Sequence, residues 1–172
     1  MPTDKKHLLD ANVFIEAKRR YYAFDLCPGF WECLVWHHQE ACVQSIDRVK
    51  RELELGGDDL QEWVASAMPA TCFVSSDDPS VISQFSQMLT WVQGQAQFSP
   101  EAKAEFAAKA DGWLIAHAKA RNLVLVTQEV FARDARRKVP MPNVCEAFDV
   151  AYVDTFTMLR DLETQFDWRR KI

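Results

Sequence analysis

Four acidic residues each lie where a hydrophobic segment ends or turns its apolar face, and together they could hold a metal ion. They are Asp10, Glu52, Asp111 and Glu129. No single motif brings them together in the sequence, so only the fold can gather them. Carboxylate oxygens are the ligands that hard cations such as Mg²⁺ prefer, and a cation held there can activate water for hydrolysis. These acids therefore predict a metal-binding pocket.

Asp10 has the most informative position of the four. It ends a short apolar segment at residues 7–9, and an amphipathic helical pattern follows directly. In open α/β sheets, ligands bind beyond the carboxyl ends of the parallel strands. The alternative is that Asp10 is a helix N-cap, a position at which Asp is favoured. Asn12, two residues later, could serve as the cap instead or orient the Asp10 carboxylate.

Glu52 lies at the border of an apolar helical stripe. Ile46, Val49 and Leu53 define this stripe at helical spacing. Arg48, four residues before Glu52, could form an ordinary ion pair with it on the helix surface. For a glutamate considered alone, this surface pair is the favoured interpretation.

Asp111 shares the buried stripe of its own predicted helix. Leu114, Ile115 and Ala118 follow it at the spacing of one helix face. A carboxylate on an apolar face is costly unless it is paired or bound to metal. The alternative is an N-cap at a helix restart, where Gly112 would loosen the turn. Between these two, the pattern favours a functional Asp111.

Glu129 repeats the arrangement of Asp10, because it closely follows a predicted strand at residues 123–127. The alternative is an acid in the first turn of the next helix, which the helix dipole favours. Thr127, at the end of the strand, could donate a hydrogen bond to a carboxylate or to bound water. It is therefore predicted, like Asn12, to support the acids.

A group of basic residues follows Glu129. Arg133, Arg136 and Arg137, with Lys138, are predicted to form a basic helical edge. Such an edge is usually a solvated face. Its closeness to Glu129 nevertheless allows contact with a phosphate backbone.

Composition limits the classes of protein to which the chain can belong. Its 172 residues, 48% of them hydrophobic, suit one domain with a substantial core. No apolar run approaches the roughly 20 residues of a membrane span, and no signal peptide is evident. The five scattered cysteines fit reduced thiols, so a cytoplasmic location is expected. The net charge of −5 means that a nucleic-acid partner would require cations or local basic patches.

Strand patterns alternate with helical patterns along the chain. Strands are predicted at residues 8–11, 71–74, 123–127 and 150–154, and helices at 13–21, 28–38, 45–55, 58–67, 79–92, 99–121 and 155–166. This alternation predicts an α/β fold, a three-layer sandwich with a central, mostly parallel β-sheet flanked by helices. The whole chain, 1–172, is expected to be a single domain with a helical insert at about residues 22–68.

Four short motifs in order resemble those of the PIN domain, and most closely those of VapC-type toxins of bacterial toxin–antitoxin pairs. They are LLDAN at residues 8–12, VKREL at 49–53, ADGWLIAHA at 110–118 and LVTQE at 125–129. The resemblance covers roughly residues 8–154. Each motif is short, and the specificity comes from finding four in the same order.

This resemblance implies an endoribonuclease that depends on Mg²⁺ or Mn²⁺. Asp10, Glu52 and Asp111 match the family's metal-binding acids, and Glu129 matches a fourth acid that is usually aspartate. The expected partners are an RNA substrate, a cognate antitoxin protein and a second copy of the chain in a homodimer. Two alternatives stay open: a non-catalytic module that binds a basic partner, and a structure-specific DNA nuclease.

Overall fold

Five parallel strands form the centre of the structure, a computed structural model that describes residues 4–170. The strands are β1 (His7–Leu9), β2 (Val43–Ile46), β3 (Phe73–Val74), β4 (Val124–Val126) and β5 (Tyr152–Val153). Their order across the sheet is β3-β2-β1-β4-β5. In register, His7 lies opposite both Val43 and Val124.

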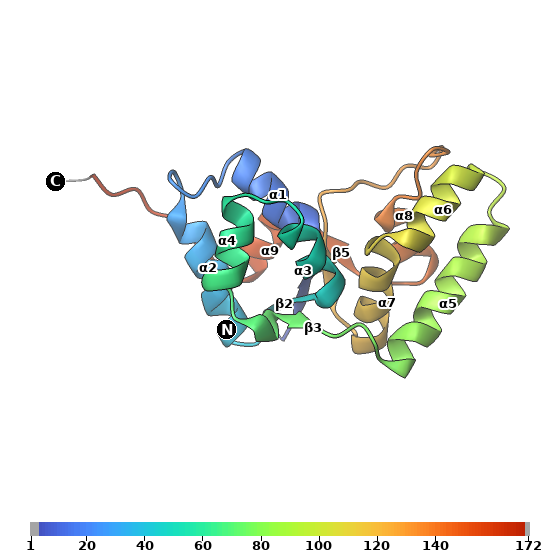
Figure 1. Cartoon of the computed structure of the whole chain (residues 1–172), viewed down its shortest axis with the longest axis horizontal. Coiled ribbons are helices and arrows are strands. Elements are labelled where there is room, and N and C mark those ends of the chain that lie inside the picture. The colour runs from blue at the N-terminus through green and yellow to red at the C-terminus, as the bar shows by residue number, and fades with distance from the viewer. Residues whose placement is uncertain (1–3, 171–172) are drawn as a thin grey trace.

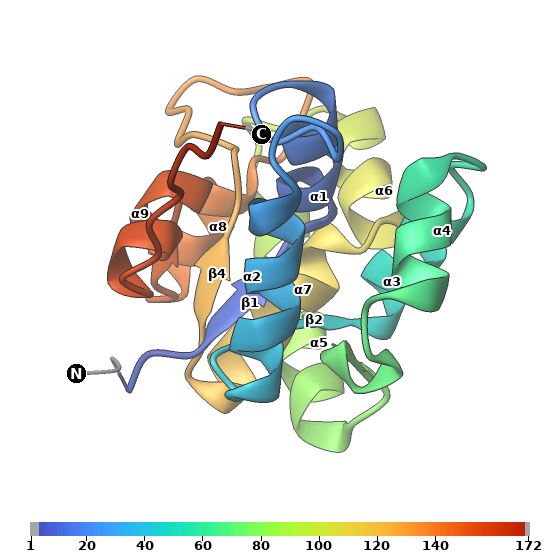
Figure 2. The ribbon, with the colours of Figure 1, turned by 90° about the vertical axis from the view of Figure 1, so that its left-hand side faces the viewer.

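Helices cover both faces of this sheet (Figure 1). They are α1 (Ala11–Arg19), α2 (Pro28–Gln39), α3 (Asp47–Glu54), α4 (Asp59–Ser66), α5 (Pro79–Gly94), α6 (Pro100–Ala108), α7 (Asp111–Arg121), α8 (Met141–Ala147) and α9 (Thr155–Asp161). In Figure 2, α2 lies in front of β1 and β4, while α5 and α7 lie behind them. The predicted three-layer α/β fold is confirmed.

The central strands are buried on both faces. All three residues of β1 are fully buried, so its side chains do not alternate between core and solvent. Leu125 and Val126 of the neighbouring β4 are fully buried as well. Continuous burial of this kind is expected of a parallel sheet that is covered by helices on both sides.

The strand order reverses direction between β1 and β4. The chain leaves β1 for β2 and then β3 on one side, and it returns to β4 on the other side of β1. Such a reversal opens a crevice at the carboxyl ends of the two strands, where ligands of open α/β sheets bind. Asp10 directly follows β1, and Thr127 directly follows β4. The topology therefore places both residues at this crevice.

Residues 22–68 are not a purely helical insert, contrary to the prediction. They contain β2, which pairs with β1 on one side and β3 on the other. The segment from residue 45 was predicted to be helical, but α3 begins only at Asp47. This part of the chain therefore contributes an inner strand of the sheet.

Two further predictions in the second half of the chain were wrong. The helix predicted for residues 99–121 is two helices, because the backbone at Lys109 is extended between α6 and α7. The basic residues Arg133 to Lys138 lie in an irregular loop, and α8 follows only at Met141. Within residues 4–170, no helix is long and apolar enough to cross a membrane.

Candidate functional site

The Asp10 carboxylate is buried at the carboxyl end of β1, with a residue exposure of 3%. Asp10 occupies the N-cap position of α1, but its side chain makes no capping hydrogen bond. Instead, Oδ2 of Asp10 accepts a hydrogen bond from Thr127 Oγ1 at 3.2 Å. The carboxylate is thus directed toward the end of β4, and it does not cap the helix that follows it.

Asp111 is the first residue of α7, with Ala110 at the N-cap position. The break after α6 places it there, so a helix does restart at this point, but Asp111 is not the N-cap residue that the alternative interpretation supposed. Burial and the charge of Glu129 raise its pKa to about 6, although the lysines Lys138 and Lys109 oppose this shift.

Asp10 and Asp111 are each affected by the negative charges of Glu129 and Glu52. Burial, together with the negative charges of Asp111 and Glu129, raises the pKa of Asp10 to about 8. Thr127 opposes this shift through its hydrogen bond, and Glu52 adds a smaller repulsion. A buried carboxylate whose nearest charged neighbours are also acids is destabilised in its ionised form. A bound cation would relieve that cost.

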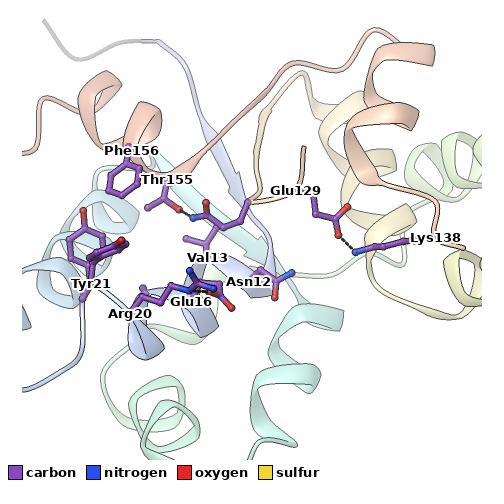
Figure 3. A pocket seen from close by; sticks show the side chains of 12 residues that line it. Asn12, Val13, Glu16, Arg20, Tyr21, Glu129, Lys138, Thr155 and Phe156 are labelled. Atoms are coloured by element: carbon purple, nitrogen blue, oxygen red, sulfur yellow. Dashed lines mark hydrogen bonds and ion pairs between the residues drawn. The ribbon is translucent and has the colours of Figure 1, made fainter. Parts of the chain in front are cut away.

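Glu129 already has two partners within the protein. Its Oε1 atom forms an ion pair with Lys138 Nζ, and the Glu129 side chain is only 12% exposed (Figure 3). Its Oε2 atom accepts a hydrogen bond from the backbone N–H of Met141 at 2.9 Å. Met141 begins α8, and the first N–H groups of a helix lack partners within the helix. One oxygen of Glu129 therefore accepts a hydrogen bond from the first N–H group of α8, and the other oxygen pairs with Lys138.

Glu52 lies on the exposed side of α3, at the rim of the acidic cluster. The surface ion pair predicted between Arg48 and Glu52 is not formed. Arg48 Nε instead donates a hydrogen bond to Ser76 Oγ at 3.1 Å, and its guanidinium stacks 4.0 Å from the centre of the Trp113 ring. The Arg48 side chain thus connects α3 with α7.

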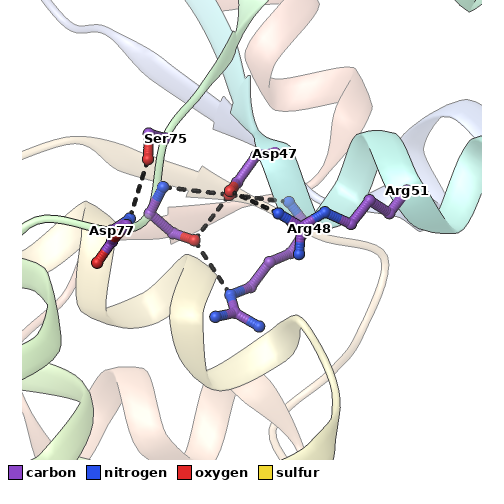
Figure 4. Close-up of polar contacts among 6 residues, drawn as sticks. Asp47, Arg48, Arg51, Ser75 and Asp77 are labelled. Atoms are coloured by element: carbon purple, nitrogen blue, oxygen red, sulfur yellow. Dashed lines mark hydrogen bonds and ion pairs between the residues drawn. The ribbon is translucent and has the colours of Figure 1, made fainter.

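Asp47 ties the ends of β2 and β3 together (Figure 4). Its Oδ1 atom accepts hydrogen bonds from the backbone N–H of Ser76 at 3.1 Å and from the Ser76 hydroxyl at 2.7 Å. The N–H of Arg48 donates to the same oxygen at 3.0 Å. The sequence did not indicate this residue, because its role depends on β3 lying beside β2. The network fixes the strand ends on one flank of the acidic cluster.

The chemistry of these side chains suits a hard divalent cation. Asp10 and Asp111 offer carboxylate oxygens, and both have raised pKa values because they are buried near other acids. As they stand, the side chains of residues 4–170 include no group of three or more His, Cys, Asp or Glu arranged to hold a metal. Mg²⁺ commonly takes only one or two carboxylates and keeps several waters. The carboxylates of Asp10 and Asp111 are therefore donors of the type and number that Mg²⁺ takes from proteins.

A cavity of about 440 Å³ adjoins the acids, and Asn12 lines it together with Glu129 and Lys138. Asn12 is the second residue of α1, two residues after Asp10 in the sequence. The sequence did not indicate the remaining lining residues, which include Tyr21 and Phe156. Tyr21 lies two residues after the end of α1 and Phe156 is the second residue of α9, and no motif in the sequence marks either position.

The three arginines after Glu129 lie in the exposed loop between β4 and α8. Backbone oxygens hold this loop against the segment before α6. The carbonyl of Arg133 accepts a hydrogen bond from Gln97 Nε2 at 2.8 Å, and that of Arg136 accepts one from the N–H of Ser99 at 2.8 Å. The side chains of Arg133, Arg136 and Arg137 are therefore presented to solvent from an anchored loop.

Comparisons with known proteins agree with this architecture. The structure of FitAcB from Neisseria gonorrhoeae is similar with a TM-score of 0.52 and 21% sequence identity, over 85% of this chain and 95% of that chain. At this identity the similarity shows the fold alone, which is PIN-like. No curated protein matches the chain significantly. A family model matches residues 7–166, and the chain therefore belongs to the family described as Domain of unknown function (DUF4411).

Proposed function

We propose that the protein is a nuclease that depends on a divalent cation and hydrolyses phosphodiester bonds of single-stranded RNA. One observation carries this proposal: Asp10 is buried at the crevice where the sheet reverses its strand order, and the charges of Asp111 and Glu129 act on it there. Clustered acids at such a crevice suit a cation that in turn binds a phosphate group. The PIN-like fold supports a nuclease.

Each residue has a separate role in this proposal. Asp10 and Asp111 hold the cation, and the hydrogen bond from Thr127 orients the Asp10 side chain and favours its ionised form. Glu52, at the exposed rim, adds negative charge that acts on Asp10 and Asp111 and so helps to attract the cation. Mg²⁺ or Mn²⁺ would supply positive charge to the scissile phosphate and make water a stronger nucleophile. In the hydrolysis, a bond forms between the water oxygen and phosphorus, and the bond between phosphorus and the leaving oxygen breaks. The proton that the water gives up ends on the leaving oxygen.

Glu129 is proposed as a supporting acid rather than a direct ligand. Both of its oxygens contact the protein, one at Lys138 and one at the N–H of Met141. Its charge still raises the pKa of Asp111 and so contributes to the negative potential that attracts a cation. The longer glutamate side chain makes this contact with the start of α8 possible.

The substrate must approach a protein whose net charge is −5. The exposed arginines Arg133, Arg136 and Arg137 provide a local positive surface beside the site. Arginine contacts to phosphate groups supply affinity that does not depend on nucleotide sequence. These residues are therefore proposed to hold the RNA backbone while the acids act on one phosphate.

The biological setting is proposed from the PIN-like fold and the VapC-like motifs. They support a toxin that acts in the cytoplasm, that is inhibited by a cognate antitoxin protein and that forms a homodimer. A growth assay tests this setting. Expression of the chain alone should stop growth, whereas the Asp10→Asn variant should not.

Cleavage by the purified protein tests the reaction itself. Wild-type protein should cut single-stranded RNA with Mg²⁺ or Mn²⁺ and should stop when EDTA is added. Asp10→Asn and Asp111→Asn should abolish cleavage, while Asp167→Asn, which alters an exposed aspartate in the C-terminal segment, should not. Preference for single-stranded or forked DNA would support the DNA nuclease instead.

A specific observation favours a second candidate, the non-catalytic module that binds a basic partner. The Lys138 ammonium group already pairs with Glu129, so this acidic site can accept a positively charged side chain. On this alternative, a lysine or arginine of a partner would occupy the place proposed for the cation. Absence of RNA and DNA cleavage, combined with tight binding of a basic peptide that Asp10→Asn weakens, would support it.

A further inference from the structure

The cavity beside the acidic cluster has two chemically different ends. Figure 3 shows Glu129 and Lys138 at one end and Tyr21 and Phe156 at the other. Its volume of about 440 Å³ lies within the range of small-molecule sites, roughly 300–1,000 Å³. The cavity therefore has room for one nucleoside next to the position proposed for the phosphate.

Two aromatic side chains at the far end are unusually exposed. Tyr21 is 74% exposed and Phe156 is 43% exposed. Tyr22, which also lines the cavity, stacks on Phe30 with ring centres 4.5 Å apart and an angle of 1° between the rings. Its ring centre lies 6.4 Å from that of Phe156. The aromatic end is thus anchored on the core while offering free ring faces.

Polar groups line the space between the two ends. Glu16 Oε2, on α1, pairs with Nε of Arg20, the residue directly after the helix, at 2.6 Å. Across the cavity, Gln128 Nε2 donates a hydrogen bond to Thr155 Oγ1. Apolar rings with a few polar groups around them are the usual lining of a site that binds a flat heterocycle.

The strand order gives the cavity its place along a bound nucleic acid. Gln128 follows β4 and Thr155 follows β5, whereas Asp10 follows β1. The sheet runs β1-β4-β5, so the cavity lies directly beside the acids along the carboxyl edge. A strand whose phosphate is at Asp10 and Asp111 would bring the adjacent base to the cavity.

We propose that this cavity binds one base of single-stranded RNA, the base next to the phosphate at the acidic cluster. This inference rests on the proposed nuclease function and adds a binding site for the substrate. Tyr21 and Phe156 stack on the base, and Arg20, Gln128 and Asn12 offer hydrogen bonds to its edge. Aromatic stacking accepts any base, whereas the polar groups confer a preference among bases.

The test is an affinity measurement without cleavage. Fluorescently labelled RNA hexamers are bound in EDTA and followed by fluorescence anisotropy. One hexamer is intact, and the others each carry a single abasic position. Tyr21→Ala and Phe156→Ala should each weaken binding of the intact hexamer by roughly tenfold. Tyr21→Phe should bind like wild type, because it keeps the ring.

The abasic hexamers separate a base-binding cavity from a general loss of affinity. For wild-type protein, removal of one particular base should weaken binding, and in Tyr21→Ala and Phe156→Ala the same removal should have little further effect. Trp168→Ala, which removes an exposed aromatic side chain outside the cavity, should behave like wild type. Equal weakening of intact and abasic hexamers in the two cavity variants would overturn the inference.

This experiment also distinguishes failure of the cavity from failure of the nuclease. If wild-type protein cleaves RNA but Tyr21→Ala and Phe156→Ala bind the intact hexamer as tightly as wild type does, the base site is wrong and the nuclease stands. If the protein binds RNA through this cavity but never cleaves it with Mg²⁺ or Mn²⁺, the base site stands and the nuclease is wrong.

Discussion

The Thr127 hydroxyl donates a hydrogen bond to the Asp10 carboxylate over 3.2 Å and so joins the carboxyl ends of β4 and β1. The Thr127 hydroxyl oxygen also accepts a hydrogen bond from the backbone N–H of Glu129 at 3.1 Å. The Thr127 side chain therefore orients the Asp10 carboxylate and also fixes the start of the loop that carries Glu129. This relationship gives Thr127 an effect on the acids that can be measured.

Thr127→Val should weaken cation binding. A hydrogen bond to a charged group contributes about 1.5–3 kcal/mol, so its loss should raise the pKa of Asp10 by about one to two units. At pH 7, Mg²⁺ would then compete with a more tightly held proton, and calorimetry should show binding that is weaker by about tenfold to hundredfold. Thr127→Ser keeps the hydroxyl and should bind Mg²⁺ like wild type. Equal affinities for the valine and serine variants would contradict this role of Thr127.

Stability of the metal-free protein should fall as pH rises. Asp10 has a pKa of about 8 in the folded protein, against an ordinary value of 3.8. The folded state therefore holds an extra proton between these values, and the free energy of unfolding decreases with pH in that window. One proton gives a slope of up to about 1.4 kcal/mol per pH unit.

Urea unfolding in EDTA from pH 5 to 8 checks this slope. Asp10→Asn removes the titrating group, so the free energy of unfolding should depend less on pH in this variant than in wild type. Saturating Mg²⁺ should flatten the wild-type profile as well, because the ionised carboxylates then have a cation. Parallel profiles for wild type and Asp10→Asn in EDTA would show that Asp10 does not carry a raised pKa.

Lys138→Met should strengthen cation binding and should lower the free energy of unfolding of the metal-free protein. The Lys138 ammonium pairs with Glu129 and lowers the pKa of Asp111, so it acts as a fixed positive charge at the edge of the cluster. Its repulsion of a bound cation is on the order of 1–2 kcal/mol. The increase in melting temperature caused by Mg²⁺ should therefore be larger in Lys138→Met than in wild type.

Lys18→Met is the matched control for Lys138→Met. Lys18 forms ion pairs with Asp58 and Asp59, away from the acidic cluster. Its loss should not change the response to Mg²⁺. If both lysine variants respond to Mg²⁺ like wild type, Lys138 does not compete with the cation.

Gly112→Ala should destabilise the start of α7. A Cβ atom at this position would lie 2.8 Å from Phe85 Cε2 and 3.0 Å from the Phe106 ring. Overpacking of this kind costs about 1–3 kcal/mol. Gly94→Ala is the control, because its Cβ would meet nothing within 4 Å. Denaturant unfolding should show a lower free energy of unfolding for Gly112→Ala and an unchanged one for Gly94→Ala.

The layered fold could be predicted from the sequence, whereas one inner strand could not. Leu8, Leu9, Leu125 and Val126 form continuous apolar segments, which indicate buried parallel strands. Strand β2 lacks this pattern because Ser45 occupies one of its buried positions. Ser45 donates a hydrogen bond to the carbonyl of Leu9 at 2.7 Å, so its burial depends on a neighbour that the local sequence does not specify.

The position of Asp111 also depends on tertiary packing. Residues 101–110, directly before it, are rich in alanine and contain neither proline nor glycine, so helix propensity predicts one continuous helix. The structure breaks the helix at Lys109, whose backbone is extended. Close packing of Gly112 against Phe85 and Phe106 places the start of α7. The sequence identified Asp111 as an acid on an apolar face, but not the turn that brings it to Asp10.

The partners of Glu129 could not be predicted from the sequence either, because they also depend on tertiary structure. The charged segment after it was predicted to be helical, and a helix there would not return Lys138 and Met141 to Glu129. The irregular loop does so through an ion pair and a hydrogen bond to the first N–H of α8. Propensity and periodicity do not specify a loop of this length, and contacts with Gln97 and Ser99 hold it in place.

The most direct test of the shared cation is a calorimetric titration of Mg²⁺ or Mn²⁺ into protein from which metals have been removed. Wild-type protein and Asp167→Asn should bind the ion with the same affinity. Asp10→Asn and Asp111→Asn should each lose most of the binding heat, because both carboxylates are proposed to hold the same ion. If Asp10→Asn binds the ion as tightly as wild-type protein does, the acidic cluster is not the metal site.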